Sequence, residues 1–240
     1  MWLGALALCA ALIGAVEAFW RIQGFRPDVP DTQELWSFWR NRANRGDGRV
    51  VVLLGTSRMK ADIDLPTMES RLPGYKIVQL AVIGDESPIG TLRELALDES
   101  FRGVVLCGMV APLFERSRWE DQRNYYSAEF DSSVIRNIAC RSFLQSKYAA
   151  FNPNLGIRTL LGQWLDAHRF PKPDFKHQTL RRSLRYDFTA AGDLPRQRQE
   201  LAERYRTLYA EVRAGGSLPA GRDYDELNQL IATIRARGGN

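Results

Sequence analysis

The sequence has few of the side chains that carry redox or metal chemistry. Only 3 cysteines and 2 histidines occur in 240 residues. Cys9, Cys107 and Cys140 lack the spacing of a metal site, and we expect buried thiols rather than a disulfide between Cys107 and Cys140. No paired metal ligands, phosphate-binding loop or dinucleotide-binding motif is present. The sequence therefore predicts no metal and no other cofactor.

Lysine is also scarce, although the chain is basic. The formal net charge of +5 comes almost entirely from arginine, and the lysines are limited to Lys60, Lys76, Lys147, Lys172 and Lys176. The arginines are scattered, without a basic run interleaved with aromatic residues that could stack on bases. This pattern is typical of a solvated surface, and we expect no nucleic-acid partner.

One long stretch without charge lies at the amino terminus. Residues 1–16, MWLGALALCAALIGAV, contain no charged side chain, and Glu17 then ends the run. We expect a membrane-spanning helix over residues 1–20, with Trp2 and Trp20 at the two interfaces, because a spanning helix needs about 20 residues. The alternatives are a secretory signal peptide cleaved near Glu17 and a buried helix of a soluble protein.

The charges that flank this segment favour a cytoplasmic domain. Only the amino terminus itself precedes the segment, whereas a series of arginines follows it: Arg21, Arg26, Arg40, Arg42, Arg45 and Arg49. By the positive-inside rule alone, the part of the chain after the helix stays in the cytoplasm. A family resemblance described below implies the opposite side, so both orientations remain open at this point.

The remainder of the chain suits one domain preceded by a linker. Hydrophobic residues make up 45% of the chain and aromatic residues 10%, which is enough for a core of ordinary size. Residues 21–48 contain two prolines and read as a linker, followed by a short helix over 32–42 with Asp31 as its cap. We expect the folded domain to occupy residues 49–240.

After the linker, strands and helices alternate. Apolar runs predict strands over residues 50–54, 75–82 and 103–107. Helices are predicted after the caps Asp64 and Ser87-Pro88. Apolar runs without strict polar alternation, separated by helices, predict an α/β domain with a parallel sheet that is covered on both faces.

The second half of the domain departs from this rhythm. Residues 111–191 are rich in aromatic residues without a clean period, and we expect a helical and irregular insertion there. Further helices are predicted over residues 197–213 and after a capping box formed by Asp223 and Glu226. Three strands are fewer than the ~5 of a typical sheet, so we expect a sheet that is incomplete at the carboxyl end of the sequence.

The most informative stretch is VVVLLGTSR, residues 50–58. A strand rich in β-branched residues runs directly into Gly55-Thr56-Ser57-Arg58. A side chain at the carboxyl end of a parallel strand faces the crevice in which open α/β sheets bind their ligands. Ser57 is therefore either a nucleophile at a strand tip or a turn serine whose hydroxyl bonds to the backbone.

This stretch, together with KIVQLAVIG at residues 76–84, resembles the first two blocks of the SGNH/GDSL hydrolase superfamily. The likeness covers residues 49–110 and is greatest to the membrane-anchored SGNH-like proteins of bacteria that are associated with acetylation of extracellular polysaccharides. It implies a flavodoxin-like three-layer sandwich with Ser57 as nucleophile. It also implies an oxyanion hole made by the backbone N–H groups of Ser57 and Gly84.

Two parts of the family pattern are missing. No asparagine follows the third expected strand, where the family has a further oxyanion donor. The family's Asp-x-x-His block supplies a general base and its orienting carboxylate, and no such block lies near the carboxyl end. Asp174-Phe175-Lys176-His177 has the right spacing, so Asp174 and His177 are candidates, but they lie inside the expected insertion. The alternative reading of His177 is a surface histidine.

Two functional hypotheses follow. The first is a single-pass protein of the bacterial inner membrane whose periplasmic SGNH-like domain is a serine esterase or O-acyltransferase for polysaccharide esters. Its expected partners are the lipid bilayer, through residues 1–20, and an acyl-ester or polysaccharide substrate. The second is a membrane-tethered binding or scaffold protein that keeps the fold without catalysis, which the missing family blocks favour.

Overall fold

A computed structural model describes most of the chain: residues 2–44, 48–84, 86–109, 116–120, 122, 132–167, 171–187, 193, 195, 196, 198–200, 202, 203, 206, 207, 210 and 221–239. The chain divides into two compact units. The anchor unit comprises Met1–Asp31, Asp131–Leu180 and Leu184–Gly192. The sheet unit comprises Thr32–Phe130, Arg181–Ser183 and Asp193–Asn240.

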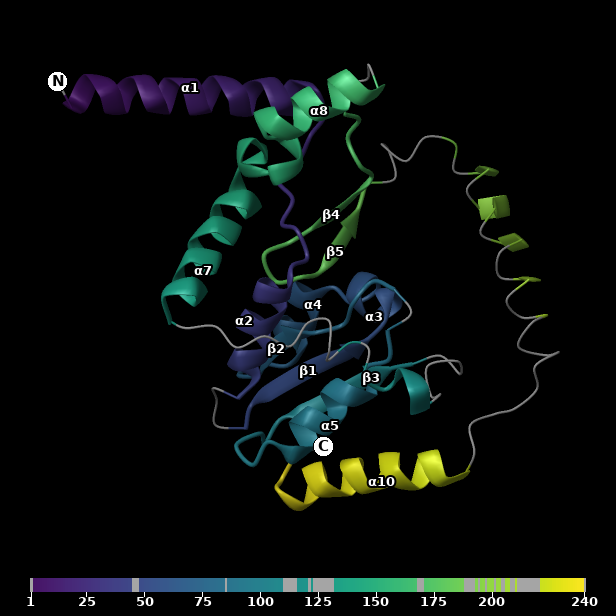
Figure 1. Ribbon diagram of the computed structural model, residues 1–240. Coiled ribbons are helices and arrows are strands. Elements are labelled where there is room, and N and C mark those ends of the chain that lie inside the picture. The colour runs from purple at the N-terminus through teal and green to yellow at the C-terminus, as the bar shows by residue number, and fades with distance from the viewer. Residues whose placement is uncertain are drawn as a thin grey trace. The chain divides into compact units, whose positions relative to one another are not determined.

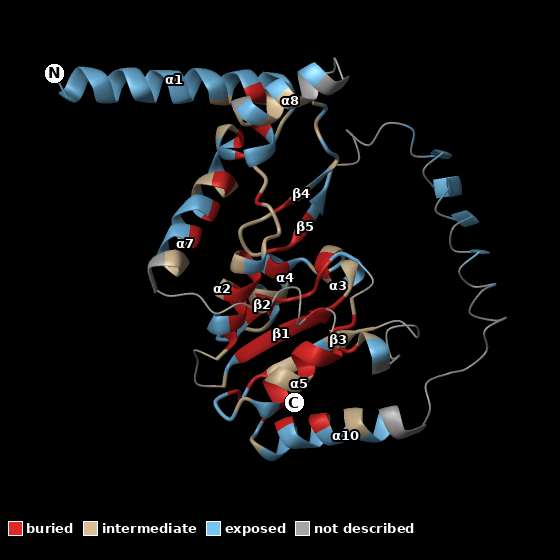
Figure 2. Cartoon of the chain, in the orientation of Figure 1, coloured by how far each residue is buried: buried red, intermediate tan, exposed pale blue. Residues whose placement is uncertain are grey.

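The sheet unit is built on three parallel strands in the order β2-β1-β3 (Figure 1). They are β1 (Val50–Gly55), β2 (Lys76–Gln79) and β3 (Val104–Gly108). Every residue of β1 is buried, as Figure 2 shows, because the strand is central and covered on both faces. The α/β class and the parallel sheet predicted from the sequence are confirmed.

Helices pack around this sheet. They are α2 (Gln33–Ala43), α3 (Ser57–Ala61), α4 (Leu65–Arg71), α5 (Ile89–Leu97) and α10 (Gly221–Ala236), with a 3-10 turn η2 (Arg116–Arg118). Contacts join α2 to β1 and β2, α4 to β2, and α10 to α5. One core cluster joins Val51 and Leu53 of β1 to Leu65 of α4 and Ile77 of β2.

The second strand is shorter than the predicted range 75–82, but its hydrogen bonds to β1 continue beyond Gln79. The Leu80 N–H donates to the Leu53 carbonyl at 2.9 Å, and the Val82 N–H donates to the Gly55 carbonyl at 3.0 Å. The two segments of the chain therefore remain paired as far as Val82, although regular strand geometry ends at Gln79.

Helix starts correct several predicted caps. Asp64 is confirmed, since its carboxylate accepts from the Thr67 N–H at 3.1 Å. The cap of α2 is Thr32 and not Asp31, because only the residue directly before the first turn can reach its N–H groups. At α5 the cap position is Pro88, as predicted for Ser87-Pro88, and Ser87 Oγ accepts from the Ile89 N–H at 3.5 Å. Because α10 begins at Gly221, Asp223 lies inside the helix and is not its cap.

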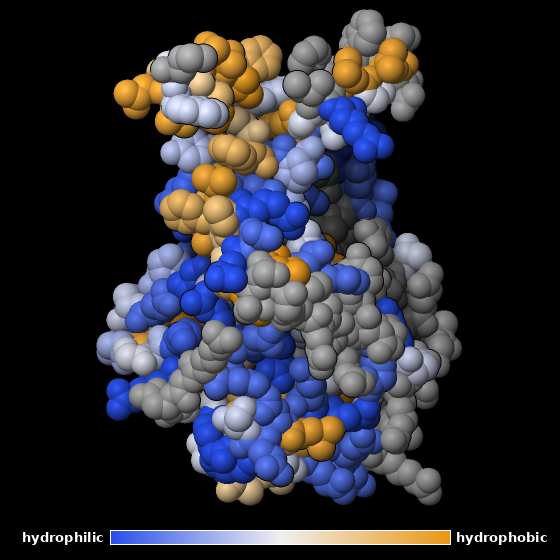
Figure 3. All heavy atoms as spheres, turned by 60° about the vertical axis from the view of Figure 1, so that its left-hand side comes forward, coloured by the Kyte–Doolittle hydropathy of each residue, from blue (hydrophilic) through white to orange (hydrophobic). Residues whose placement is uncertain are grey.

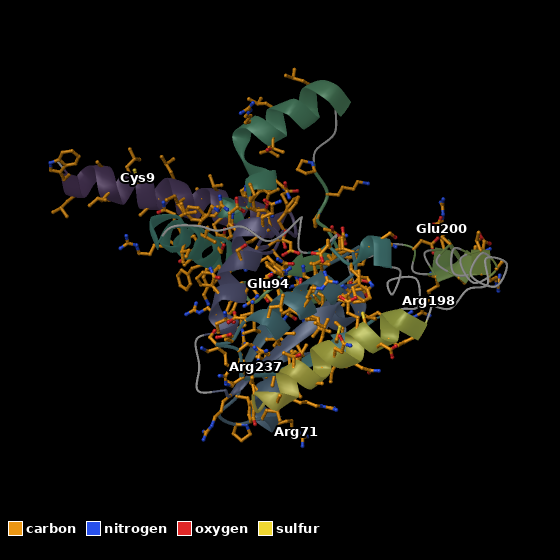
Figure 4. All side chains as sticks on the ribbon, turned by 60° about the horizontal axis from the view of Figure 1, so that its bottom comes forward. Cys9, Arg71, Glu94, Arg198, Glu200 and Arg237 are labelled. Atoms are coloured by element: carbon orange, nitrogen blue, oxygen red, sulfur yellow. The ribbon has the colours of Figure 1, made fainter. Side chains whose placement is uncertain are left out.

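A buried arginine ties α2 to α5. Arg40 Nε lies 3.0 Å from Glu94 Oε1, and its Nη2 lies 3.4 Å from Asp98 Oδ2. Burial raises the pKa of Asp98, but hydrogen bonds from Ser100 and the charge of Arg40 outweigh it, and the net pKa is lowered. Arg237, which follows α10, donates to the Ala96 carbonyl at 2.6 Å and so caps the end of α5 (Figure 4).

Two consecutive arginines satisfy the outer edge of β2. Residues that point away from β1 leave their carbonyls unpaired in the ladder. Arg181 donates to the Ile77 carbonyl at 2.8 Å, and Arg182 donates to the Gln79 carbonyl at 2.7 Å. Arg182 is fully buried with φ 63°. Within the described ranges, side chains and not another strand bond the carbonyls of this edge.

The anchor unit contains α1 (Trp2–Ile22), α7 (Ser132–Lys147), the 3-10 turns η3 (Ala149–Phe151) and η4 (Pro153–Leu155), and α8 (Ile157–Ala167). It also contains an antiparallel hairpin of β4 (Lys176–Gln178) and β5 (Leu184–Tyr186). Part of the predicted helical and irregular insertion over 111–191 thus has regular structure. The helix predicted over 197–213 falls largely outside the described residues.

Among the described helices, α1 alone is long and apolar enough to cross a membrane, by length and composition. Its apolar window has a mean hydropathy of 1.9 and is 0% buried, whereas the core helix of a soluble protein is mostly buried. Its carboxyl end packs on the rest of the anchor unit, where Trp20 joins a core cluster with Ala149 and Leu155. Glu17 Oε2 accepts from the Ala150 N–H at 2.9 Å.

Candidate active site

Ser57 and Gly84 leave two neighbouring strands at the same level. The hydrogen bond from the Val82 N–H to the Gly55 carbonyl aligns the two segments. Ser57 lies two residues after Gly55, and Gly84 lies two residues after Val82. In a parallel sheet, this is the carboxyl edge at which α/β proteins place their ligands. The sheet therefore brings the ends that carry Ser57 and Gly84 side by side.

Ser57 is the first residue of α3 and is partly exposed. Its hydroxyl makes no hydrogen bond to any residue that the structure describes, and Thr56, at the cap position, makes no capping bond either. The backbone N–H groups of Ser57 and Gly84 likewise donate to none of the described residues. Two backbone donors and one hydroxyl are thus available at this edge.

The floor of the site is made by glycines. Gly55 and Gly108 are register partners at the ends of β1 and β3, and Gly55 has φ +136°. A Cβ on Gly55 would collide with the Gly108 carbonyl, and a Cβ on Gly108 would collide with the Met59 side chain. The strand ends approach each other closely, and Met59 of α3 lies over both.

Gly84 also has φ +136°, a conformation that side chains rarely adopt. The carboxylate of Glu86 folds back over it and occupies the space of a Cβ. Glu86 Oε2 is buried and has no hydrogen-bond partner among the described residues. A negative charge beside this N–H opposes the build-up of negative charge on a bound oxyanion.

Lys60 was not among the predicted site residues. It follows Ser57 by three positions on α3, so both side chains lie on one side of the helix, and its side chain is 0% exposed. Serine followed by lysine after two residues is the spacing that serine–lysine enzymes use to activate a nucleophile. The Ser-x-x-Lys spacing is present in the sequence and could have identified Lys60 as a candidate site residue.

Other groups near the sheet offer less chemistry. Burial raises the pKa of the Cys107 thiol to about 12, so this residue of β3 stays protonated and is a poor nucleophile. All three cysteines are free, and both Cys9 (Figure 4) and Cys140 are exposed rather than buried. Within the described ranges, no group of three His, Cys, Asp or Glu residues could hold a metal ion.

His177 and Asp174 belong to the anchor unit, whereas Ser57 belongs to the sheet unit. His177 lies in β4 opposite Arg185 of β5. Burial lowers the pKa of His177, and the charge of Arg26 lowers it further. Asp174 Oδ1 accepts from the Lys176 N–H at 3.2 Å and makes no hydrogen bond to His177.

The carboxylates that act on His177 electrostatically are Asp28 and Asp187. Asp174 is therefore not in position to orient the His177 imidazole, and a catalytic role for Asp174 and His177 stays a prediction. The other histidine, His168, lies outside the described residues.

Comparisons of the chain with models of protein families, with curated proteins and with solved structures found no match.

Proposed function

We propose that this chain is a membrane-anchored serine esterase or O-acyltransferase of the SGNH-like class, acting on polysaccharide esters at the periplasmic face of the bacterial inner membrane. The observation that carries the proposal is the pairing of Ser57 with Gly84 at adjacent strand ends, with their N–H groups unbonded to described residues. Such donors stabilise the oxyanion of a tetrahedral intermediate.

Catalysis would proceed through an acyl-enzyme. The Ser57 hydroxyl attacks the ester carbonyl carbon while a base takes its proton, and the oxyanion binds the Ser57 and Gly84 N–H groups. The intermediate collapses, the C–O bond to the alcohol breaks, and the base returns the proton to that alcohol. Water, or a sugar hydroxyl in a transferase, then attacks the acyl-serine and releases the acyl group.

We assign the base to Lys60, with His177 as the alternative. Lys60 is on the same helix as Ser57, and its three-residue spacing matches that of known serine–lysine pairs. Lys60 has an interaction partner of its own in the structure, and within the described residues no hydrogen bond joins it to Ser57. Catalytic hydrogen bonds often form only when substrate is bound, which is compatible with this role.

Retention of α1 as an anchor, rather than its removal as a signal peptide, is supported by its contacts. Trp20 is 3% exposed, and Arg21 donates to the Lys147 carbonyl at 3.0 Å. Cleavage near Glu17 would remove the carboxylate that binds the Ala150 N–H and would cut the helix on which Trp20 is held. The folded anchor unit thus uses the end of α1 as a structural part.

A chromogenic acetyl ester tests the proposal. Ser57→Ala should lower turnover about a thousandfold or more, whereas Ser70→Ala, which alters an exposed serine on α4, should leave it unchanged. Lys60→Arg keeps the positive charge but cannot act as a base, so the protein should fold and lose turnover. Full turnover in Lys60→Arg together with a loss in His177→Gln would move the base to His177.

Glu86 favours a second candidate function, a membrane-tethered protein that binds a ligand without catalysis. Its carboxylate beside Gly84 disfavours an oxyanion at that place. Ester turnover that is equal in wild type and Ser57→Ala, with the chain still in the membrane, would support this second candidate over the first.

A further inference from the structure

The anchor unit contains a cationic cavity beside the carboxyl end of α1. Its volume is about 770 Å³, within the range of small-molecule sites. The charged lining comes from three segments of the chain. Its charged and titratable members are Arg21 at the end of α1, Arg26 in the arm that follows, and His177, Arg185 and Asp187 in the hairpin.

Positive charge exceeds negative charge in this lining. Arg26 forms an ion pair with Asp187, and Arg21 Nε lies 2.6 Å from Glu17 Oε1. Arg185 is exposed, and its guanidinium group makes no ion pair or hydrogen bond with any residue in the described part of the chain. One guanidinium group is thus left to bind an anion, and guanidinium is well suited to phosphate.

The cavity begins where the hydrophobic helix ends. α1 has 21 residues, and at ~1.5 Å per residue its length matches the ~30 Å hydrocarbon core of a bilayer. Arg21 lies in its last turn, and Arg26 follows five residues later. If α1 spans the membrane, these residues lie at the level of the lipid headgroups.

The surroundings of the cavity suit a membrane interface. Several large apolar side chains of the same unit are exposed: Phe143 50%, Tyr148 43%, Phe151 37%, Leu161 54% and Leu165 64%. In α8, Leu161 and Leu165 are one turn apart, next to Leu160, which packs on the Trp20 cluster. In Figure 3, hydrophobic residues gather at the top of the view, over α1 and α8.

We propose that this cavity binds the phosphate group of an anionic membrane lipid, with Arg185 as its main contact and Arg26 as a second cation. Free phosphate has the same chemistry, but the position of the cavity at the end of α1 favours the lipid. The inference goes beyond the proposed ester chemistry. It rests on α1 lying in the membrane and is independent of Ser57.

Native mass spectrometry of the full chain in neutral detergent, with equal amounts of phosphatidylglycerol and phosphatidylcholine, tests the proposal. The wild type should retain phosphatidylglycerol about tenfold more than phosphatidylcholine. Arg185→Gln should remove this preference, and Arg185→Lys should keep most of it because the charge remains. Arg141→Gln, an exposed cation of α7 outside the cavity, is the matched control and should change nothing.

Equal retention of the two lipids would overturn the proposal, as would equal losses in Arg185→Gln and Arg141→Gln. Thermal unfolding checks the fold of each variant. A second arm follows the imidazole signals of His177 by NMR. If phosphatidylglycerol shifts these signals and inorganic phosphate does not, the cavity is a lipid site. If both ligands shift them with equal affinity, the cavity is a site for soluble phosphate. Ser57→Ala should retain lipid like the wild type. Failure of the proposed ester chemistry can therefore be distinguished from failure of the lipid-binding proposal.

Discussion

Gly55 and Gly108 are partners in the register of β1 and β3, and the carbonyl of Gly108 occupies the space that a side chain on Gly55 would need. This close approach sets the position of the turn that carries Ser57. The sheet thus fixes the site through backbone contact, and the Gln79 side chain of β2 adds to it by donating to the Met59 carbonyl of α3 at 2.8 Å.

We expect Gly55→Ala to be far more damaging than Gly108→Ala. At Gly55 both the φ of +136° and the fixed carbonyl oppose a side chain, for a combined cost of roughly 3 kcal/mol or more in unfolding free energy. At Gly108 the added methyl meets only the flexible Met59 side chain, at a cost of about 1 kcal/mol. Chemical denaturation measures both, and equal losses would contradict this reading.

Glu86→Gln should accelerate acylation of Ser57. The carboxylate lies over Gly84, and its charge opposes the oxyanion by about 1 kcal/mol or more, because two unit charges about 4 Å apart interact by that much in bulk water and more strongly at a buried site. Removal of that charge should raise the acylation rate several-fold. Pre-steady-state ester kinetics provide the measurement. A slower variant would instead make Glu86 part of the catalytic machinery.

His177 should make the anchor unit less stable as the pH falls. Burial and Arg26 hold its folded-state pKa below the 6.5 of an unfolded chain. Between pH 6.5 and the folded pKa, the unfolded chain binds the proton more readily, so stability is lost. Above pH 6.5 both states are neutral, and the residue contributes no pH dependence.

Chemical denaturation in detergent at pH 7.5 and pH 5.5 compares the wild type with His177→Gln. The variant should lose less stability between the two pH values. Asp28 works in the opposite direction at lower pH, because burial raises its pKa and its protonation favours the folded state. A variant with the same pH dependence as the wild type would exclude this role of His177.

The side of the membrane is open to a direct test. Alkaline phosphatase fused after Asn240 should be active in bacterial cells, because the enzyme needs the oxidising periplasm to form its disulfides. A fusion to a cytoplasm-compatible fluorescent protein is the control. An inactive phosphatase with a bright fluorescent fusion would place the domain in the cytoplasm, as the arginines after α1 favour.

The local features of the fold were predictable from the sequence. The apolar runs of β1 and β3 and the cap Asp64 depend on neighbouring residues, and each appears where the pattern placed it, within one residue. Thr32 shows the limit, since several polar residues precede α2 and the sequence pattern alone does not say which of them caps its first turn.

Long-range features were not predictable. Arg181 and Arg182 close the edge of β2 from about 100 positions further along the chain, and no local pattern announces such a contact. Burial of Lys60 likewise arises from packing of α3 on the sheet. The identity of the base stays a prediction.

The central claim is that Ser57 is a nucleophile. A fluorophosphonate probe followed by intact-mass and peptide analysis tests it, because the probe bonds covalently only to an activated serine. We expect one adduct on wild-type protein, located at Ser57, and none on Ser57→Ala, while Ser70→Ala is labelled like the wild type. Equal labelling of wild type and Ser57→Ala, or no labelling of folded wild-type protein, would contradict the account.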